Sequence, residues 1–118
     1  TVLVVEDDHV VRRLILDVLA ELGYRALEAA DGATGLGILL SDVHIDLLVT
    51  DIGLPELNGR QLAERARVRR PKLKILFITG YADHADTDIG NLEVGMQMLV
   101  KPFQMEALAQ RIQEMIEI

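Results

Sequence analysis

The 118-residue chain contains no cysteine, which excludes disulfides, thiol catalysis and cysteine-ligated metals. Its net charge of −7 argues against general affinity for nucleic acid, and no apolar run approaches the roughly 18 residues that span a bilayer. Half of the residues are apolar but only 3% are aromatic, so we expect one domain over residues 1–118 with an aliphatic core, located in the cytoplasm.

The chain begins with an expected strand, Val2–Val5, which leads into an acidic run of three residues, Glu6-Asp7-Asp8. A helix should follow, because apolar residues then recur with a 3.6-residue period. They are Val11, Leu14, Ile15, Val18, Leu19 and Leu22. Asp8 is a suitable N-cap for this helix, and Gly23 is a typical C-terminal stop.

A weaker strand and helix come next. Tyr24–Ala29 alternates apolar and polar residues, as edge strands do. Asp31-Gly32 is expected to form a turn before a helix at Ala33–Leu40, although Gly35 and Gly37 lower the helix propensity there. These glycines match neither the dinucleotide-binding pattern nor the P-loop pattern. We therefore interpret them as a glycine-rich helix start.

The middle of the chain predicts a buried strand that ends at a carboxylate. Ile45–Val49 is apolar and leads directly to Asp51, after which comes a loop rich in Gly, Pro and Asn. Gly59–Arg69 predicts a helix that stops before Pro71. Asp51 should therefore lie where a buried strand reaches the surface.

Two more strands, Leu73–Ile78 and Met96–Val100, are separated by the ambiguous segment Asp83–Val94. Gly90, Asn91 and Gly95 disfavour a helix there. The chain closes with an amphipathic helix. Its apolar positions are Met105, Leu108, Ile112, Met115 and Ile116. The order strand–helix, repeated five times, predicts an α/β fold with a parallel sheet and helices on both faces, joined by right-handed crossovers.

Polar residues follow four of the five expected strands. In a parallel sheet the carboxyl ends of the strands lie along one edge, where ligands bind. The residues that should meet there are Glu6, Asp7, Asp51, Thr79 and Lys101.

Carboxylates that lie close together repel one another, and a divalent cation removes that repulsion. A set of oxygen ligands with few carboxylates suits Mg²⁺ better than Ca²⁺. With such a cation in place, Asp51 could accept a phosphoryl group, and Lys101 and the Thr79 hydroxyl could hold its oxygens.

Each of these residues has a simpler explanation when it is taken alone. Glu6 and Asp7 would favour the start of the first helix, and Asp51 would cap the loop or helix that follows it. Thr79 would be a turn residue, and Lys101 a solvated residue at the end of its strand. Their joint placement at strand ends favours a common site.

With these motifs in view, the chain resembles a response-regulator receiver domain of two-component signalling from Val2 onward. The matching motifs are Val4-Val5-Glu6-Asp7-Asp8, Thr50-Asp51-Ile52-Gly53-Leu54-Pro55 with Asn58-Gly59, Ile78-Thr79-Gly80 and Lys101-Pro102-Phe103. The resemblance implies a flavodoxin-like, doubly wound (βα)5 fold with a five-stranded sheet in the order 2-1-3-4-5.

The resemblance also implies the roles of the site residues. Asp51 would take a phosphoryl group from a phosphohistidine on a histidine kinase or a histidine phosphotransfer protein, and Thr79 and Lys101 would contact the phosphoryl oxygens. The domain would be no enzyme in its own right, but a phosphoacceptor that assists its own phosphorylation and dephosphorylation.

The resemblance further implies a Mg²⁺ site at the same edge. Asp7 would bind the ion directly and Glu6 through water, with Asp51 and the backbone carbonyl of Gly53 as further ligands. We also expect a cis peptide bond between Lys101 and Pro102, where the ammonium turns inward as the chain turns outward.

One position departs from the family pattern. Met98 stands where many receivers carry Tyr or Phe. Gly90, Asn91 and Gly95 lower the helix propensity of Ala82–Gly95, so we expect this segment to be the least ordered. With Met98 in place of the aromatic residue, we expect the segment to change its order on phosphorylation and to carry the output, with Tyr81 supplying a ring. The sequence of Phe77–Ala82 resembles that of receivers attached to hybrid histidine kinases.

The alternative function is a receiver-like interaction module that is not phosphorylated. We expect no direct nucleic-acid binding and no membrane insertion. The sequence leaves open whether the protein forms a homodimer. The chain begins directly on its first expected strand, which is compatible with excision from a longer protein. A basic stretch is either a solvated helix face or a docking surface for an acidic partner. It consists of Arg60, Arg65, Arg67, Arg69, Arg70, Lys72 and Lys74.

Overall fold

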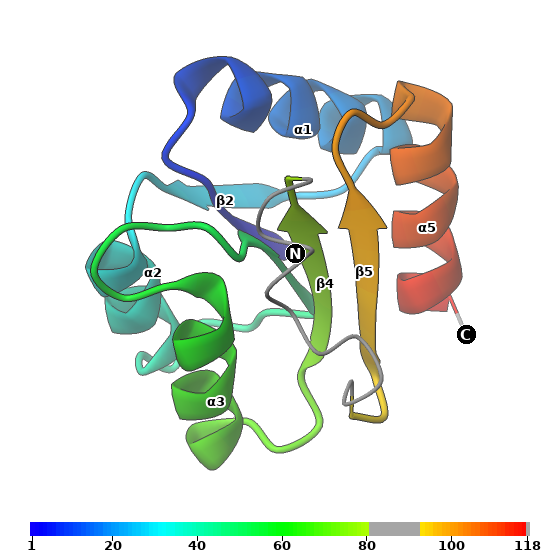
Figure 1. Cartoon of the computed structure of the whole chain (residues 1–118). Helices are drawn as coiled ribbons and strands as arrows, with labels where there is room; N and C mark the ends of the chain where they lie inside the picture. The colour runs from blue at the N-terminus through cyan, green and yellow to red at the C-terminus, as the bar shows by residue number, and fades with distance from the viewer. Residues whose placement is uncertain (81–92, 118) are drawn as a thin grey trace.

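The computed structural model describes residues 1–80 and 93–117, in which strands and helices alternate. They are β1 (Val2–Val5), α1 (His9–Leu22), β2 (Ala26–Ala29), α2 (Gly32–Leu39), β3 (Leu47–Asp51), α3 (Gly59–Arg69), β4 (Lys74–Thr79), β5 (Met96–Val100) and α5 (Met105–Glu117). The strands form one parallel sheet in the order β2-β1-β3-β4-β5 (Figure 1). The predicted fold class and strand order are confirmed.

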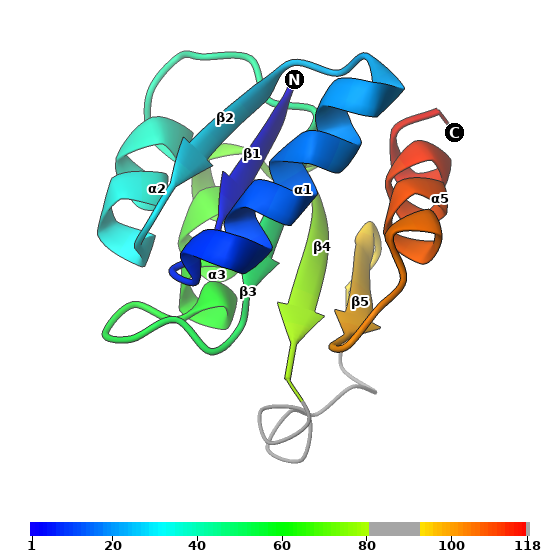
Figure 2. The same ribbon diagram turned by 90° about the horizontal axis from the view of Figure 1, so that it is seen from above.

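The sheet lies between two helical layers, α1 and α5 on one face and α2 and α3 on the other (Figure 2). Alternate residues of β1 face opposite layers, with Val2 and Val4 in the core under α1 and α5, and Leu3 and Val5 in the core under α2 and α3. Burial on both faces explains why the inner strands read as continuous apolar runs.

Both ends of α1 form as the sequence predicts. The Asp8 carboxylate accepts hydrogen bonds from the amides of Val10 and Val11, and Gly23 ends α1 with a φ of 82°. Asn58 and Gln61 form a reciprocal capping box at the start of α3. Within residues 1–80 and 93–117, no helix combines the length and the apolar character needed to cross a membrane.

Several boundaries differ from the expected ones. The Asp31 side chain accepts a hydrogen bond from the amide of Thr34, so Asp31-Gly32 is the beginning of α2 and no separate turn precedes it. A Cβ on Gly35 would lie 2.7 Å from a Val5 methyl group, so this glycine allows α2 to pack closely on β1. The helix therefore forms in spite of its low propensity, because close packing on the sheet stabilises it.

The strands also differ from their expected limits by one or two residues. β2 begins at Ala26, and β3 begins at Leu47 and includes Asp51. β4 extends from Lys74 to Thr79. The expectations for Ala82–Gly95 as a switch and for Tyr81 concern residues 81–92, which lie outside the described residues.

The basic stretch contains residues that hold the fold together. Arg70 donates to the backbone carbonyls of Leu39 at 2.9 Å, Ser41 at 2.8 Å and Val43 at 2.7 Å. Arg67 likewise donates to backbone carbonyls, including that of Leu73 at 2.7 Å. Neither a solvated helix face nor a docking surface is a sufficient interpretation of this stretch. Two of its arginines donate hydrogen bonds to backbone carbonyls at the end of α2 and in the segments that follow α2 and α3.

We predict that Arg70→Ala lowers the free energy of unfolding by about 2 kcal/mol, because carbonyls that now accept from a charged donor lose that partner. Urea denaturation of both proteins measures the difference. Arg65→Ala, in the same helical region but exposed, is the control and should change stability little. Equal stabilities for the Arg70 and Arg65 variants would contradict the prediction.

Candidate functional site

The strand register brings the predicted site residues to one edge of the sheet. Val5 of β1 pairs with Thr50 of β3, so the residues that follow them, Glu6 and Asp51, are neighbours. At the end of β4, the Thr79 carbonyl accepts a hydrogen bond of 2.7 Å from the backbone amide of Lys101. Residues far apart in the sequence thus meet here, as parallel strand ends should.

Lys101 bridges two carboxylates. Its Nζ atom lies 3.0 Å from Glu6 Oε1 and 3.2 Å from Asp51 Oδ2. The Glu6 side chain is 1% exposed and that of Asp51 is 8% exposed. The alternative of a solvated strand-end lysine is therefore wrong, because this ammonium is paired inside a largely buried acidic site.

Burial and charge change the proton affinities of this pair. Burial, and then the hydrogen bond and charge of Asp51, raise the pKa of Glu6 to about 8, although Lys101 opposes this rise. Burial alone would lower the pKa of Lys101, but its contacts with Glu6 and Asp51 outweigh burial and raise that pKa. The site thus keeps the Lys101 ammonium charged and makes ionisation of the Glu6 carboxyl unfavourable.

The arrangement of carboxylates fits a small divalent cation. Glu6, Asp7 and Asp51 each offer an oxygen, and these atoms all lie within 4.8 Å of one another. Glu6 Oε2 is buried and has no hydrogen-bond partner within residues 1–80 and 93–117. A cation bound by these oxygens would remove their repulsion and satisfy that atom, and oxygen ligands of this kind suit Mg²⁺.

Asp51 is held by the backbone on both of its sides. Its Oδ1 atom accepts a hydrogen bond of 2.9 Å from the Gly53 amide, which leaves Oδ2 facing Lys101. A Cβ on Gly59 would lie 2.3 Å from the Asp51 carbonyl oxygen, so α3 begins directly against the backbone of this residue. Asp51 does cap its loop, as one alternative held, but Asn58 and not Asp51 caps α3.

Thr79 lies at the carboxyl end of β4, at the same edge of the sheet. Its side chain is buried, and its hydroxyl donates to the Gly80 carbonyl at 3.1 Å. No hydrogen bond joins Thr79 to Asp51 in the described parts of the chain. Its role toward a phosphoryl group, like that of the Gly53 carbonyl toward a metal, stays a prediction.

Two further expectations concern β5 and the residue that follows it. The Lys101–Pro102 peptide bond is cis, as predicted. Met98 is half-buried and packs against the core under α2 and α3. A thioether thus fills the place where many receivers carry an aromatic ring.

Sequence reasoning missed Arg12, which donates from Nη1 to the Glu6 carbonyl at 2.7 Å. The neighbouring Arg13 is exposed, and among residues 1–80 and 93–117 its one ion-pair partner is Asp17 in the next turn, at 3.7 Å. No local pattern distinguishes these adjacent arginines, and only the helix position relative to the apolar face would have favoured Arg12.

The chain also matches known sequences over almost its full length. The family described as "Response regulator receiver domain" matches residues 2–113. The response regulator receiver protein CpdR of Brucella abortus (strain 2308) is 36% identical over 115 residues, which cover 98% of this chain and 95% of that protein. Sensor kinase CckA of the same organism is 35% identical over 118 residues, which cover 99% of this chain but only 12% of the kinase.

Solved structures give the same result. The receiver domain of the hybrid histidine kinase CckA superimposes with a TM-score of 0.82 at 32% identity, covering 98% of this chain and 97% of that one. A response regulator receiver domain protein from Clostridium thermocellum gives a TM-score of 0.88 at 25% identity, covering 98% and 93%. The chain therefore belongs to the response regulator receiver domain family of two-component systems.

Proposed function

We propose that this domain is a phosphorylation-controlled switch in which Asp51 accepts a phosphoryl group from a phosphohistidine. The observation that carries the proposal is the position of the Lys101 ammonium, within 3.2 Å of Asp51 and beside an acidic cluster of suitable size for a cation. The donor would be a histidine kinase or a histidine phosphotransfer protein, since relatives include both a sensor kinase and a separate receiver protein.

In the transfer step, an oxygen of the Asp51 carboxylate forms a bond to phosphorus while the N–P bond of the phosphohistidine breaks. The electron pair of that bond stays on the imidazole nitrogen of the donor. Oδ1 is held by the Gly53 amide and Oδ2 faces Lys101, so the incoming phosphoryl oxygens would meet the ammonium. An ammonium already in place for this charge needs little reorganisation.

Glu6, Asp7 and Asp51 would hold a Mg²⁺ ion. The bound ion would supply positive charge that offsets the repulsion between an anionic carboxylate and an anionic phosphoryl group. The domain is then a phosphoacceptor that assists its own modification, with no separate substrate to turn over. Incubation with a small-molecule phosphodonor, with and without Mg²⁺, followed by mass spectrometry, tests this proposal.

The competing function is an interaction module that is not phosphorylated. Such a module has no need to keep Asp51, Lys101 and the acidic pair together at one edge. The paired ammonium favours the phosphorylatable switch, as does the Glu6 oxygen, which has no hydrogen-bond partner in the part of the chain that the structure describes.

We predict that Mg²⁺ binds more weakly as the pH falls below about 8, the pKa of Glu6. The cation requires ionised carboxylates, so below that pH its binding must release the Glu6 proton. For one released proton the affinity should fall by up to about tenfold per pH unit. Calorimetric titrations in two buffers of different ionisation enthalpy count the protons released. Glu6→Gln should abolish the proton release, and release that persists in this variant would contradict the assignment to Glu6.

A further inference from the structure

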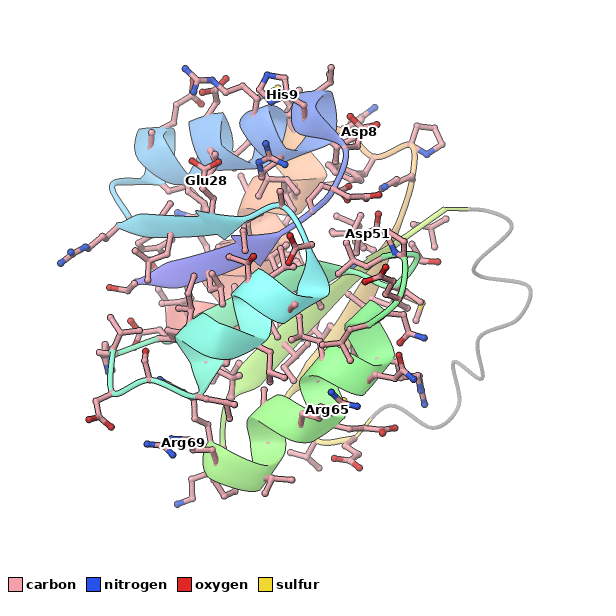
Figure 3. All side chains as sticks on the ribbon, turned by 90° about the vertical axis from the view of Figure 1, so that its left-hand side faces the viewer. Asp8, His9, Glu28, Asp51, Arg65 and Arg69 are labelled. Carbon is pink, nitrogen blue, oxygen red and sulfur yellow. The ribbon has the colours of Figure 1, made fainter. Side chains whose placement is uncertain are left out.

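Arg12 of α1 makes contacts with three parts of the chain. Its Nη1 atom donates to the Glu6 carbonyl at 2.7 Å, and its Nε atom lies 3.1 Å from Glu28 Oε1 on β2. Its Nη2 atom lies 3.3 Å from His9 Nδ1. Figure 3 shows Glu28 on β2, on the side of the sheet that faces α1, with Asp8 and His9 at the start of that helix. The Arg12 side chain is only 14% exposed, so it is held within this group.

A backbone hydrogen bond also fixes the chain after Asp7. The backbone amide of Arg12 donates to the Asp8 carbonyl at 2.9 Å. The Arg12 side chain therefore binds the Glu6 carbonyl, directly before Asp7, whereas the bond to the Asp8 carbonyl is the first backbone hydrogen bond of α1, which any residue other than proline at this position would make. Asp7 itself is exposed, so packing does not fix its position. Its placement near the buried oxygens of Glu6 and Asp51 depends on its backbone.

We infer that Arg12 is a positioning residue for the acidic pair: from α1 its guanidinium fixes the Glu6 carbonyl, and with it the backbone that leads into Asp7, and Glu28 fixes the orientation of that guanidinium. The inference rests on the proposed function, because it concerns how that site binds its cation. A guanidinium presents rigidly arranged donors, which allows one side chain to serve the Glu6 carbonyl and the Glu28 carboxylate together. A lysine in this place can serve only one of them well.

The charge of Arg12 acts in the opposite direction. A cation near the acidic pair repels a divalent ion, so charge alone predicts tighter Mg²⁺ binding when Arg12 is removed. Glu28, 3.1 Å away, offsets much of this repulsion. Positioning predicts the reverse result, because groups that orient metal ligands typically contribute 10- to 100-fold to affinity, in order-of-magnitude terms. The direction of the change therefore separates the two effects.

The test measures Mg²⁺ affinity by calorimetry and follows the backbone amides of Asp7 and Asp8 by heteronuclear NMR. Arg12→Met keeps the apolar length of the side chain and removes the donor. It should weaken Mg²⁺ binding by about tenfold, the lower end of the range for orienting groups, and shift both amides. Arg12→Lys keeps the charge and should fall between this variant and the unmodified protein.

Two further variants control for stability and for charge. Arg70→Ala removes a guanidinium that also binds backbone carbonyls, but at the opposite end of the strands, and should leave Mg²⁺ affinity unchanged. Arg13→Met removes an exposed charge of the same helix and should also leave it unchanged. Unchanged or tighter Mg²⁺ binding in Arg12→Met would overturn the inference, as would an equal loss in Arg12→Met and Arg70→Ala.

Asp7→Asn separates this inference from the function on which it rests. This substitution removes a charged ligand and should weaken Mg²⁺ binding whatever Arg12 does. If Asp7→Asn binds Mg²⁺ normally, the proposed cation site is wrong. If Asp7→Asn weakens binding and neither Arg12 variant does, the cation site stands and the role of Arg12 is wrong.

Discussion

Replacing Asp51 by Asn reduces phosphate incorporation from a small-molecule phosphodonor to background. The amide has the shape of the carboxylate, so it can still accept from the Gly53 amide at the position that Oδ1 occupies. It has lost the anionic oxygen that, in the proposed reaction, attacks phosphorus. Intact-protein mass spectrometry in the presence of Mg²⁺ counts the phosphates, and fragmentation locates them.

Asp42→Asn is the matched control for this experiment. Asp42 has a fully exposed side chain that pairs with Arg69 at 3.3 Å, and it lies between α2 and β3, before the end of β3 that is opposite Asp51. Its loss should leave incorporation unchanged. Phosphate that enters Asp51→Asn at the rate of the unmodified protein would refute Asp51 as the acceptor.

Replacing Lys101 by Met should slow phosphorylation by roughly 100-fold at saturating Mg²⁺, the typical loss when one preorganised charge-stabilising donor is removed. Mg²⁺ affinity should not fall in parallel. The ammonium contacts Glu6 and Asp51, so its removal takes a positive charge away from the oxygens that would bind the cation. The rate and the affinity should therefore change independently.

Measurements of rate against Mg²⁺ concentration separate these two quantities, and thermal unfolding shows whether the variant is folded. Lys72→Met removes an exposed lysine and is the control. A phosphorylation rate equal to that of the unmodified protein would exclude Lys101 from the chemistry. A parallel loss of Mg²⁺ affinity and rate would assign Lys101 a purely structural role.

The sequence predicts the fold well where the burial of apolar side chains determines the structure. Burial on both faces makes β1, β3 and β4 apolar, and the alternation with amphipathic helices then indicates a parallel sheet. The strand order came from the resemblance to the family and not from the pattern. The end of β3 was placed too early, because Thr50 and Asp51 are polar and yet pair with Phe77 and Ile78 of β4. A hydropathy pattern does not detect backbone pairing.

The candidate site was predictable as a set of residues but not as a set of contacts. The prediction that the strands end at one edge of the sheet placed Glu6, Asp51 and Lys101 together. Carboxylates beside an ammonium then indicated a site for a cation and a phosphoryl group. The long side chains of Arg12 and Arg70 were not predictable in the same way. Each binds backbone carbonyls, which every residue carries, so no partner residue type marks the interaction in the sequence.

The close contact between Gly59 and the Asp51 carbonyl determines which parts of the site can move. A crowded side chain relieves pressure by rotating about a single bond, whereas main chain packed against main chain has no such freedom. With no room for even a methyl group between them, β3 and the first turn of α3 form a fixed support under the acceptor carboxylate. We therefore expect a phosphoryl group on Asp51, as proposed, to be accommodated on the side of Lys101, whose ammonium lies 3.2 Å from Asp51 Oδ2. Because β3 and the first turn of α3 are rigidly packed, we expect the movement at this site to take place on the Lys101 side.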